Sequence, residues 1–87
     1  MIALEDCIAL CGLTEEEVDA IAEHEHVPEI AAATLARYLL AYQDGPELIR
    51  RMLVDDIRAA SAAGNARHAA ELTWALHHFM TAHGLGT

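Results

Sequence analysis

Four interruptions of a helical pattern constrain what this chain can fold into: Gly12, Pro28, the run Asp44-Gly45-Pro46, and Gly64. Proline cannot continue a helix and glycine readily adopts the left-handed geometry of a helix end, so each interruption separates two helices. Between them apolar residues recur at helical spacing, and 18 of the 87 residues are alanine. Since alanine is the best helix former, the sequence predicts an all-α fold and not a sandwich or barrel.

The predicted fold is a compact all-α bundle of one short and four longer helices, forming a single helical domain over residues 1–87. The expected helices span residues 3–11, 15–26, 28–42, 46–63 and 66–82. Thr14 and Glu17 have the spacing of a capping box, and Leu13 and Val18 that of a hydrophobic staple. The segment Ile30 to Tyr42 is apolar nearly all round, so we expect it to be the central, most buried helix.

Negative charge is concentrated near the N-terminus. The net charge is −9, nine of the fourteen acids lie between Glu5 and Glu29, and the first basic residue is Arg37. The chain contains no lysine. Such a surface repels nucleic acid and anionic membranes, so we expect neither as a partner, whereas a basic protein could bind the acidic N-terminal third.

The location of the protein and the state of its cysteines follow from equally simple patterns. No segment has the roughly 18 apolar residues of a membrane span, and the first residues lack the pattern of a signal peptide, so we expect a cytoplasmic protein. Cys7 and Cys11 lie four residues apart on the apolar stripe of the predicted first helix. This placement indicates buried free thiols and not a disulfide scaffold.

The stretch around Pro28 is the strongest candidate for chemistry. Glu23 and His26 have the spacing Glu-x-x-His, which over these four residues resembles the motif of ferritin-like carboxylate proteins. That resemblance implies a site for a divalent metal (Fe, Mn, Zn or Ni), with a symmetric dimer supplying a second copy of the motif. Further candidate ligands are Glu29, Glu71 and His78. The simpler alternative is a solvated helix end flanked by acids.

The same stretch permits two other interpretations. The acids around His24 and His26 favour protonated imidazoles, so this end of the molecule could change charge near neutral pH. Residues 19–40 also have the outline of a helix-turn-helix, but the second helix offers Arg37 alone as a basic group, which is wrong for DNA.

Elimination leaves a non-catalytic function as the leading hypothesis. We expect a small acidic interaction or regulatory module, with no cofactor, that forms a homodimer through apolar helix faces. The apolar residues available for that interface are Tyr38, Leu40, Val54 and Trp74. The alternative is a metal-binding protein, a ferritin-like half-bundle with its site built on Glu23 and His26.

Overall fold

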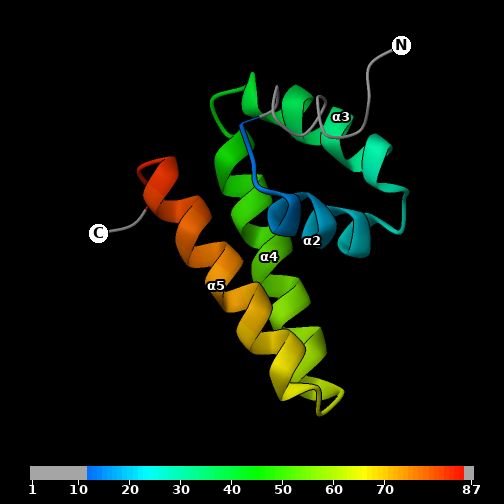
Figure 1. Ribbon diagram of the computed structural model, residues 1–87. Helices are drawn as coiled ribbons and strands as arrows, with labels where there is room; N and C mark the ends of the chain where they lie inside the picture. The colour runs from blue at the N-terminus through cyan, green and yellow to red at the C-terminus, as the bar shows by residue number, and fades with distance from the viewer. Residues whose placement is uncertain (1–11, 86–87) are drawn as a thin grey trace.

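The structure, a computed structural model, describes residues 12–85, which form four helices and no strand. The helices are α2 (Glu15–Glu25), α3 (Glu29–Leu40), α4 (Gly45–Ala62) and α5 (Ala66–Ala82), as Figure 1 shows. The all-α prediction is confirmed, and these bounds lie within two residues of the predicted ones. The predicted helix over residues 3–11, with Cys7 and Cys11, lies outside the described residues, so four described helices stand against five predicted. None of the four is both long and apolar enough to cross a bilayer.

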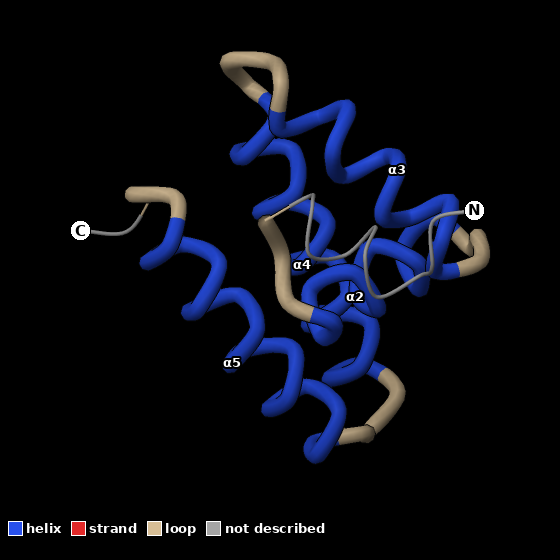
Figure 2. Tube along the Cα trace, turned by 45° about the horizontal axis from the view of Figure 1, so that its top comes forward, coloured by secondary structure: helices blue, strands red, loops and turns tan. Residues whose placement is uncertain are grey.

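The two middle elements of the architecture are α2 and α4, each of which packs against the three other described helices. α3 and α5 lie on opposite sides of the α2–α4 pair, in the two views of Figures 1 and 2. The prediction that α3 is central and most buried is therefore wrong. Its buried residues are only Ala32, Ala33 and Ala36, while Ile30 and Tyr38 are more than half exposed. Small alanines let α3 approach its neighbours closely, whereas Ile30 and Tyr38 face outward.

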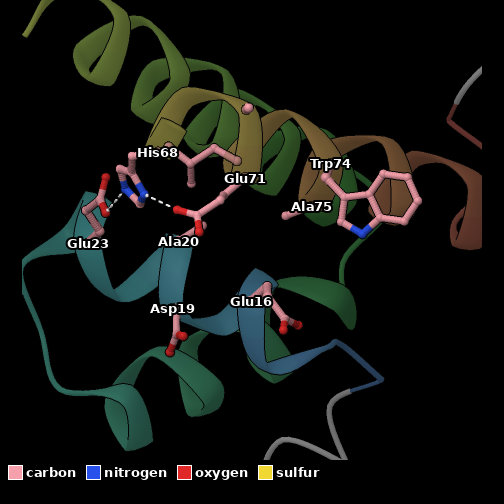
Figure 3. A pocket seen from close by; sticks show the side chains of 10 residues that line it. Glu16, Asp19, Ala20, Glu23, His68, Glu71, Trp74 and Ala75 are labelled. Atoms are coloured by element: carbon pink, nitrogen blue, oxygen red, sulfur yellow. Dashed lines mark hydrogen bonds and ion pairs between the residues drawn. The ribbon is translucent and has the colours of Figure 1, made fainter. Parts of the chain in front are cut away.

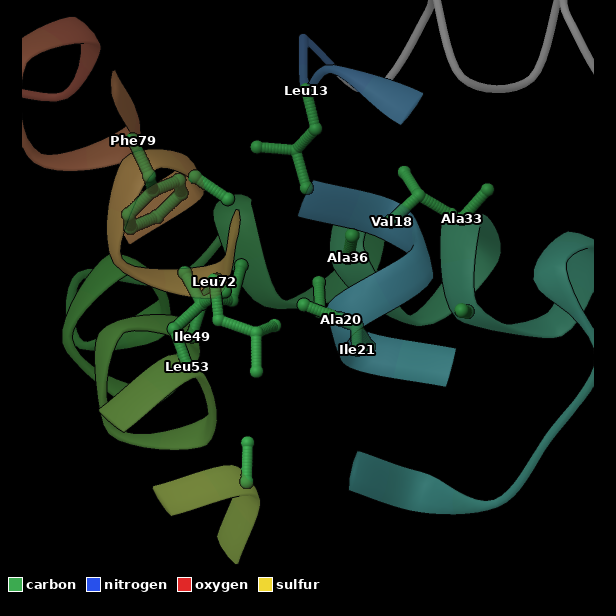
Figure 4. Close-up of a cluster of buried hydrophobic side chains, with 13 residues drawn as sticks. Leu13, Val18, Ala20, Ile21, Ala33, Ala36, Ile49, Leu53, Leu72 and Phe79 are labelled. Atoms are coloured by element: carbon green, nitrogen blue, oxygen red, sulfur yellow. The ribbon is translucent and has the colours of Figure 1, made fainter. Parts of the chain in front are cut away.

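The hydrophobic core gathers side chains from all four helices (Figure 4). Its largest fully buried apolar members are Val18 and Ile21 of α2, Ile49 and Leu53 of α4, and Phe79 of α5. Leu13, which precedes α2, is also buried. Because the apolar area removed from water is the main stabilising term, this cluster holds α2, α4 and α5 together.

The predicted capping box at the start of α2 is confirmed. The backbone N–H of Thr14 donates to Glu17 Oε1 at 2.9 Å, and the backbone N–H of Glu17 donates to Thr14 Oγ1 at 3.2 Å. Leu13 and Val18 are both buried beside it, as a hydrophobic staple requires. These contacts fix the angle at which the chain enters α2.

The end of α2 differs from the prediction by one residue. The helix stops at Glu25, and His26 adopts left-handed backbone geometry with φ of 56° and ψ of 46°. Pro28 disfavours helical geometry at Val27, and the left-handed turn at His26 redirects the chain toward α3. Residues three apart share a helix face only when both are helical. Because His26 lies outside the helix, Glu23 and His26 do not share a face as the Glu-x-x-His spacing requires.

The corner between α3 and α4 depends on Gly45. A Cβ atom at this position would lie 1.5 Å from the carbonyl oxygen of Leu39, so only glycine permits the first turn of α4 to approach the last turn of α3. Pro46 follows at the first turn of α4, where its missing N–H costs nothing.

Candidate functional site: an acidic groove between α2 and α5

A groove of 490 Å³ lies between α2 and α5 and combines an apolar floor with an acidic rim (Figure 3). The apolar lining comes from small and branched side chains, four acidic residues lie around it, and one imidazole and one indole complete the lining. The apolar lining residues are Ala20, Ala70, Leu72 and Ala75. The acidic residues are Glu16, Asp19, Glu23 and Glu71, and the imidazole and indole belong to His68 and Trp74. The four acids come from two helices that are far apart in sequence, so the fold itself concentrates the charge.

Histidine–carboxylate pairs join α2 to α5 near both ends of α2. At its C-terminal end, Glu23 Oε1 lies 2.6 Å from His68 Nε2 in the first turn of α5. Toward its N-terminal end, Glu17 Oε2 lies 3.0 Å from His78 Nδ1. The order of these pairs shows that α2 and α5 run antiparallel. Glu17, only 1% exposed, thus completes the capping box with one oxygen and reaches α5 with the other.

The imidazole of His68 contacts a second carboxylate as well. Its Nδ1 lies 3.4 Å from Glu71 Oε1, and Figure 3 shows the ring between Glu23 and Glu71. The hydrogen bond to Glu23, then that to Glu71, raises the pKa of His68 above its ordinary value of 6.5, while burial acts in the opposite direction. The two carboxylates of the groove therefore favour the protonated form of this imidazole.

A buried carboxylate lies on α4 close to the same end of the groove. Asp56 is 5% exposed, and its Oδ2 has no hydrogen-bond partner among the described residues. Burial, followed by the negative charge of Glu23, raises the pKa of Asp56 to about 6, although the nearby imidazoles of His24 and His68 act the other way. This group is ionised at neutral pH only at a cost in folding free energy.

His24 joins α2 to α4 in the same region. Its Nε2 lies 3.1 Å from Asp55 Oδ2 and its Nδ1 lies 2.7 Å from Glu25 Oε2. Burial alone would lower the pKa of His24, but the hydrogen bonds to Glu25 and Asp55 outweigh it, and the pKa is raised above 6.5. The predicted upward shift of titration is thus confirmed for His24.

A second acidic cluster forms where α2 passes the start of α3. Oxygen atoms of Glu15, Asp19 and Glu29 lie within 4.8 Å of one another. Burial raises the pKa of Asp19 to about 6, together with a hydrogen bond that protonated Asp19 donates to Glu29 and the negative charges of Glu29 and Glu16. Asp19 is therefore protonated under mildly acidic conditions.

The candidate metal ligands from the sequence are divided among separate places. Glu23 and Glu71 meet at His68, whereas His78 pairs with Glu17 farther along the groove. Glu29 lies with Asp19 at the start of α3, and His26 follows the end of α2. The structure thus brings two of the five together.

Sequence reasoning missed His68 and Asp56 as members of the site. His68 and Glu23 are 45 positions apart, so only the antiparallel pairing of α2 and α5 brings them into contact. Asp56 had a detectable signal, because it falls on the same helical stripe as Ile49, Leu53 and Ala60, all of which are buried.

The four predicted interface residues do not form one surface. Tyr38 on α3 and Trp74 on α5 are 59% and 70% exposed, but their helices lie on opposite sides of the molecule. Leu40 and Val54 are half-buried, and Leu40 packs against the core. Trp74 belongs to the groove, whereas Tyr38 lies on the outer face of α3 with Tyr42, whose hydroxyl donates to Tyr38 Oη at 2.9 Å.

The lining groups of the groove suit a ligand that is both cationic and apolar. Carboxylates on two walls attract positive charge, the alanine and leucine floor accepts an apolar side chain, and Trp74 can stack on a guanidinium or contact an ammonium. Compared with known protein families, curated proteins and solved structures, the chain shows no match.

Proposed function

We propose that this protein is a small, acidic, cytoplasmic interaction module without catalytic activity, and that it binds a basic amphipathic segment of a partner protein in the groove between α2 and α5. The observation that carries the proposal is the groove itself. It joins the carboxylates of Glu16, Glu23 and Glu71 to an apolar floor and an exposed tryptophan in one concave surface. Concave, largely apolar sites with a few placed charged groups are where proteins bind ligands.

Charge supports a basic partner in particular. The chain carries a net charge of −9, and His68 is the one basic side chain among the residues that line the groove. A negatively charged ligand would meet repulsion from both walls. A segment with arginine or lysine at helical spacing could instead place its cations on Glu16 and Glu71 and its apolar face on Leu72.

Binding of a designed probe tests this function. The probe is a synthetic amphipathic peptide of about 14 residues that repeats arginine and leucine at helical spacing. Trp74 is the only tryptophan in the chain and lines the groove, so its fluorescence reports binding directly. We expect saturable binding of this peptide and none of a peptide in which glutamate replaces each arginine.

Matched variants locate the binding site. Trp74→Ala should weaken binding, followed by calorimetry, at least tenfold, because exposed aromatic anchors dominate such interfaces. Glu16→Gln should weaken it about threefold, while Asp44→Asn, which removes one charge from the α3–α4 turn, should leave it unchanged. Equal effects of Glu16→Gln and Asp44→Asn would mean that overall charge, and not the groove, attracts the peptide.

Self-association through the outer face of α3 forms the second part of the proposal. Ile30, Tyr38 and Tyr42 are each more than half exposed on or just beyond this helix. Exposed apolar residues gathered on one helix face are typical of an interface between proteins. Sedimentation at tens of micromolar should show a homodimer that Tyr38→Glu dissociates and Trp74→Ala does not. A monomer at that concentration would remove this part of the proposal.

The metal-binding alternative now favours a different ligand set. Carboxylate oxygens of Glu15, Asp19 and Glu29 lie within 4.8 Å of one another where α2 passes the start of α3, and this set replaces the pairing of Glu23 with His26. Equilibrium dialysis with Zn²⁺, Ni²⁺, Mn²⁺ or Fe²⁺ tests it. Stoichiometric binding that Glu29→Gln abolishes and His26→Gln preserves would support this alternative, and no binding of any of the four ions would end it.

A further inference from the structure

His68 occupies the place where a bound cation would be held. Its two ring nitrogens face two carboxylates of the groove, Nε2 toward Glu23 at 2.6 Å and Nδ1 toward Glu71 at 3.4 Å. An imidazole donates from both nitrogens only when it is protonated. The groove of the free protein therefore already contains a cation of its own, supplied by α5.

The charged groups around this ring come from all three helices that meet there. α2 contributes Glu23, α5 contributes Glu71, and α4 contributes the buried carboxyl of Asp56. The neighbouring imidazole, His24, is engaged by Asp55 on α4 and by Glu25. His68 is thus the cation that neutralises Glu23 and Glu71, and no other basic side chain lines the groove among the described residues.

We propose that a cationic side chain of the bound segment displaces the imidazolium of His68 from Glu23 and Glu71, so that binding releases a proton to solvent and strengthens as the pH rises. The inference rests on the proposed function and adds its regulation. Two cations cannot share these two carboxylates without repulsion, and only His68 can lose its charge. The partner's arginine or lysine stays charged over the same pH range.

The coupling between proton release and peptide binding sets how strongly the affinity should depend on pH. Release of one proton makes affinity rise by at most tenfold for each pH unit, and the rise ends once His68 is neutral in the free protein. Because its pKa is raised above 6.5, the rise in affinity should extend above that pH. Asp19 and Asp56, each with a pKa of about 6, are already ionised there and contribute little.

Calorimetry with the arginine–leucine peptide tests the proposal. Titrations at about pH 7 in two buffers of different ionisation enthalpy report the protons released per peptide bound. We expect a fraction of one proton for the unaltered protein and none for His68→Gln, whose affinity should also be independent of pH. His26→Gln is the matched control, because it removes an imidazole outside the groove and should leave the release unchanged.

The possible outcomes distinguish failure of the His68 displacement from failure of the proposed binding function. Binding without proton release, or release that persists in His68→Gln, would overturn the displacement of His68 and leave the groove as a binding site. Absence of peptide binding at every pH would overturn both. Circular dichroism of His68→Gln should match that of the unaltered protein, because the His68 side chain is 35% exposed.

Discussion

α5 meets its two main neighbours through surfaces of opposite chemistry. Toward α4 it presents Leu72 and Phe79 to the aliphatic stripe of Ile49 and Leu53, all of them at most 4% exposed. Toward α2 it presents the histidines of two ion pairs and the wall of an open groove. Apolar burial does not depend on pH, whereas histidine–carboxylate pairs do. The contact between α4 and α5 is therefore insensitive to pH, whereas the contact between α2 and α5 depends on pH.

The largest expected effect on stability comes from disrupting the apolar contact between α4 and α5. Phe79 is fully buried, so Phe79→Ala should lower the free energy of unfolding by about 3–5 kcal/mol through lost burial and the cavity left behind. Urea denaturation followed by circular dichroism measures this change. Phe79→Leu is the control and should cost less than half as much. A loss below about 1 kcal/mol for Phe79→Ala would mean that α5 is held mainly by its polar contacts with α2.

The next largest effect on the free energy of unfolding should come from Asp56, the buried carboxyl group of α4. The folded-state pKa of Asp56, about 6, exceeds its ordinary value of 3.8, so the folded protein holds this proton more tightly than the unfolded chain. Stability is then lost as the pH rises from about 4 to about 6. Asp56→Asn cannot ionise and should raise the free energy of unfolding at about pH 8 by about 1–3 kcal/mol.

Urea denaturation of Asp56→Asn at two pH values provides the check. At about pH 3 the carboxyl is mostly neutral in both states, so the variant and the parent should differ little. Asp55→Asn, on the exposed neighbouring position, serves as the control and should show no such gain. Loss of stability at about pH 8 in Asp56→Asn would show that an interaction favours the Asp56 carboxylate.

The local features of the fold were predictable because they depend on neighbours in sequence. Thr14 with Glu17, and the turns at Pro28 and Gly45, act over a few residues, and the helix bounds follow from them. The burial of α3 was not predictable, because an apolar composition does not show which face is covered. Ala32, Ala33 and Ala36 of α3 pack inward, and Ile30 and Tyr38 remain exposed.

The site was predictable only in part, for two physical reasons. The pairing of Glu23 with His68 depends on the docking of α2 against α5, which no local pattern encodes. Asp56 lies on the inner stripe of α4, but ionised side chains are rarely buried, so a composition rule places it outside. The acidic character of the N-terminal third was visible from the sequence, and the groove adds Glu71 from the far end of the chain.

A smaller effect should come from the histidine pairs themselves. The folded-state pKa values of His24 and His68 are raised, so these pairs stabilise the fold fully below about 6.5, and the stabilisation is lost as the pH rises through the raised values. The side chains of His24 and His68 are 27% and 35% exposed, so solvent screens these pairs and we expect a loss of about 1 kcal/mol in total between about pH 6 and 8.5.

A double variant isolates this contribution. His24→Gln combined with His68→Gln should remove the decline in unfolding free energy above about pH 6.5, whereas His26→Gln should preserve it. A decline of the same size in the double variant would assign the pH dependence to other groups and would weaken the contrast between the two sides of α5.

The smallest effect on stability should come from the other aromatic residue of α5. Trp74 is 70% exposed on the α2 side, so Trp74→Ala should change the free energy of unfolding by less than about 0.5 kcal/mol, against the several kcal/mol expected for Phe79→Ala. Urea denaturation followed by circular dichroism compares the two variants directly. If Trp74→Ala were as destabilising as Phe79→Ala, the indole would be part of the core and could not serve as an anchor for a partner. A large loss of peptide binding with almost no loss of stability is what distinguishes a surface kept for binding from one kept for folding.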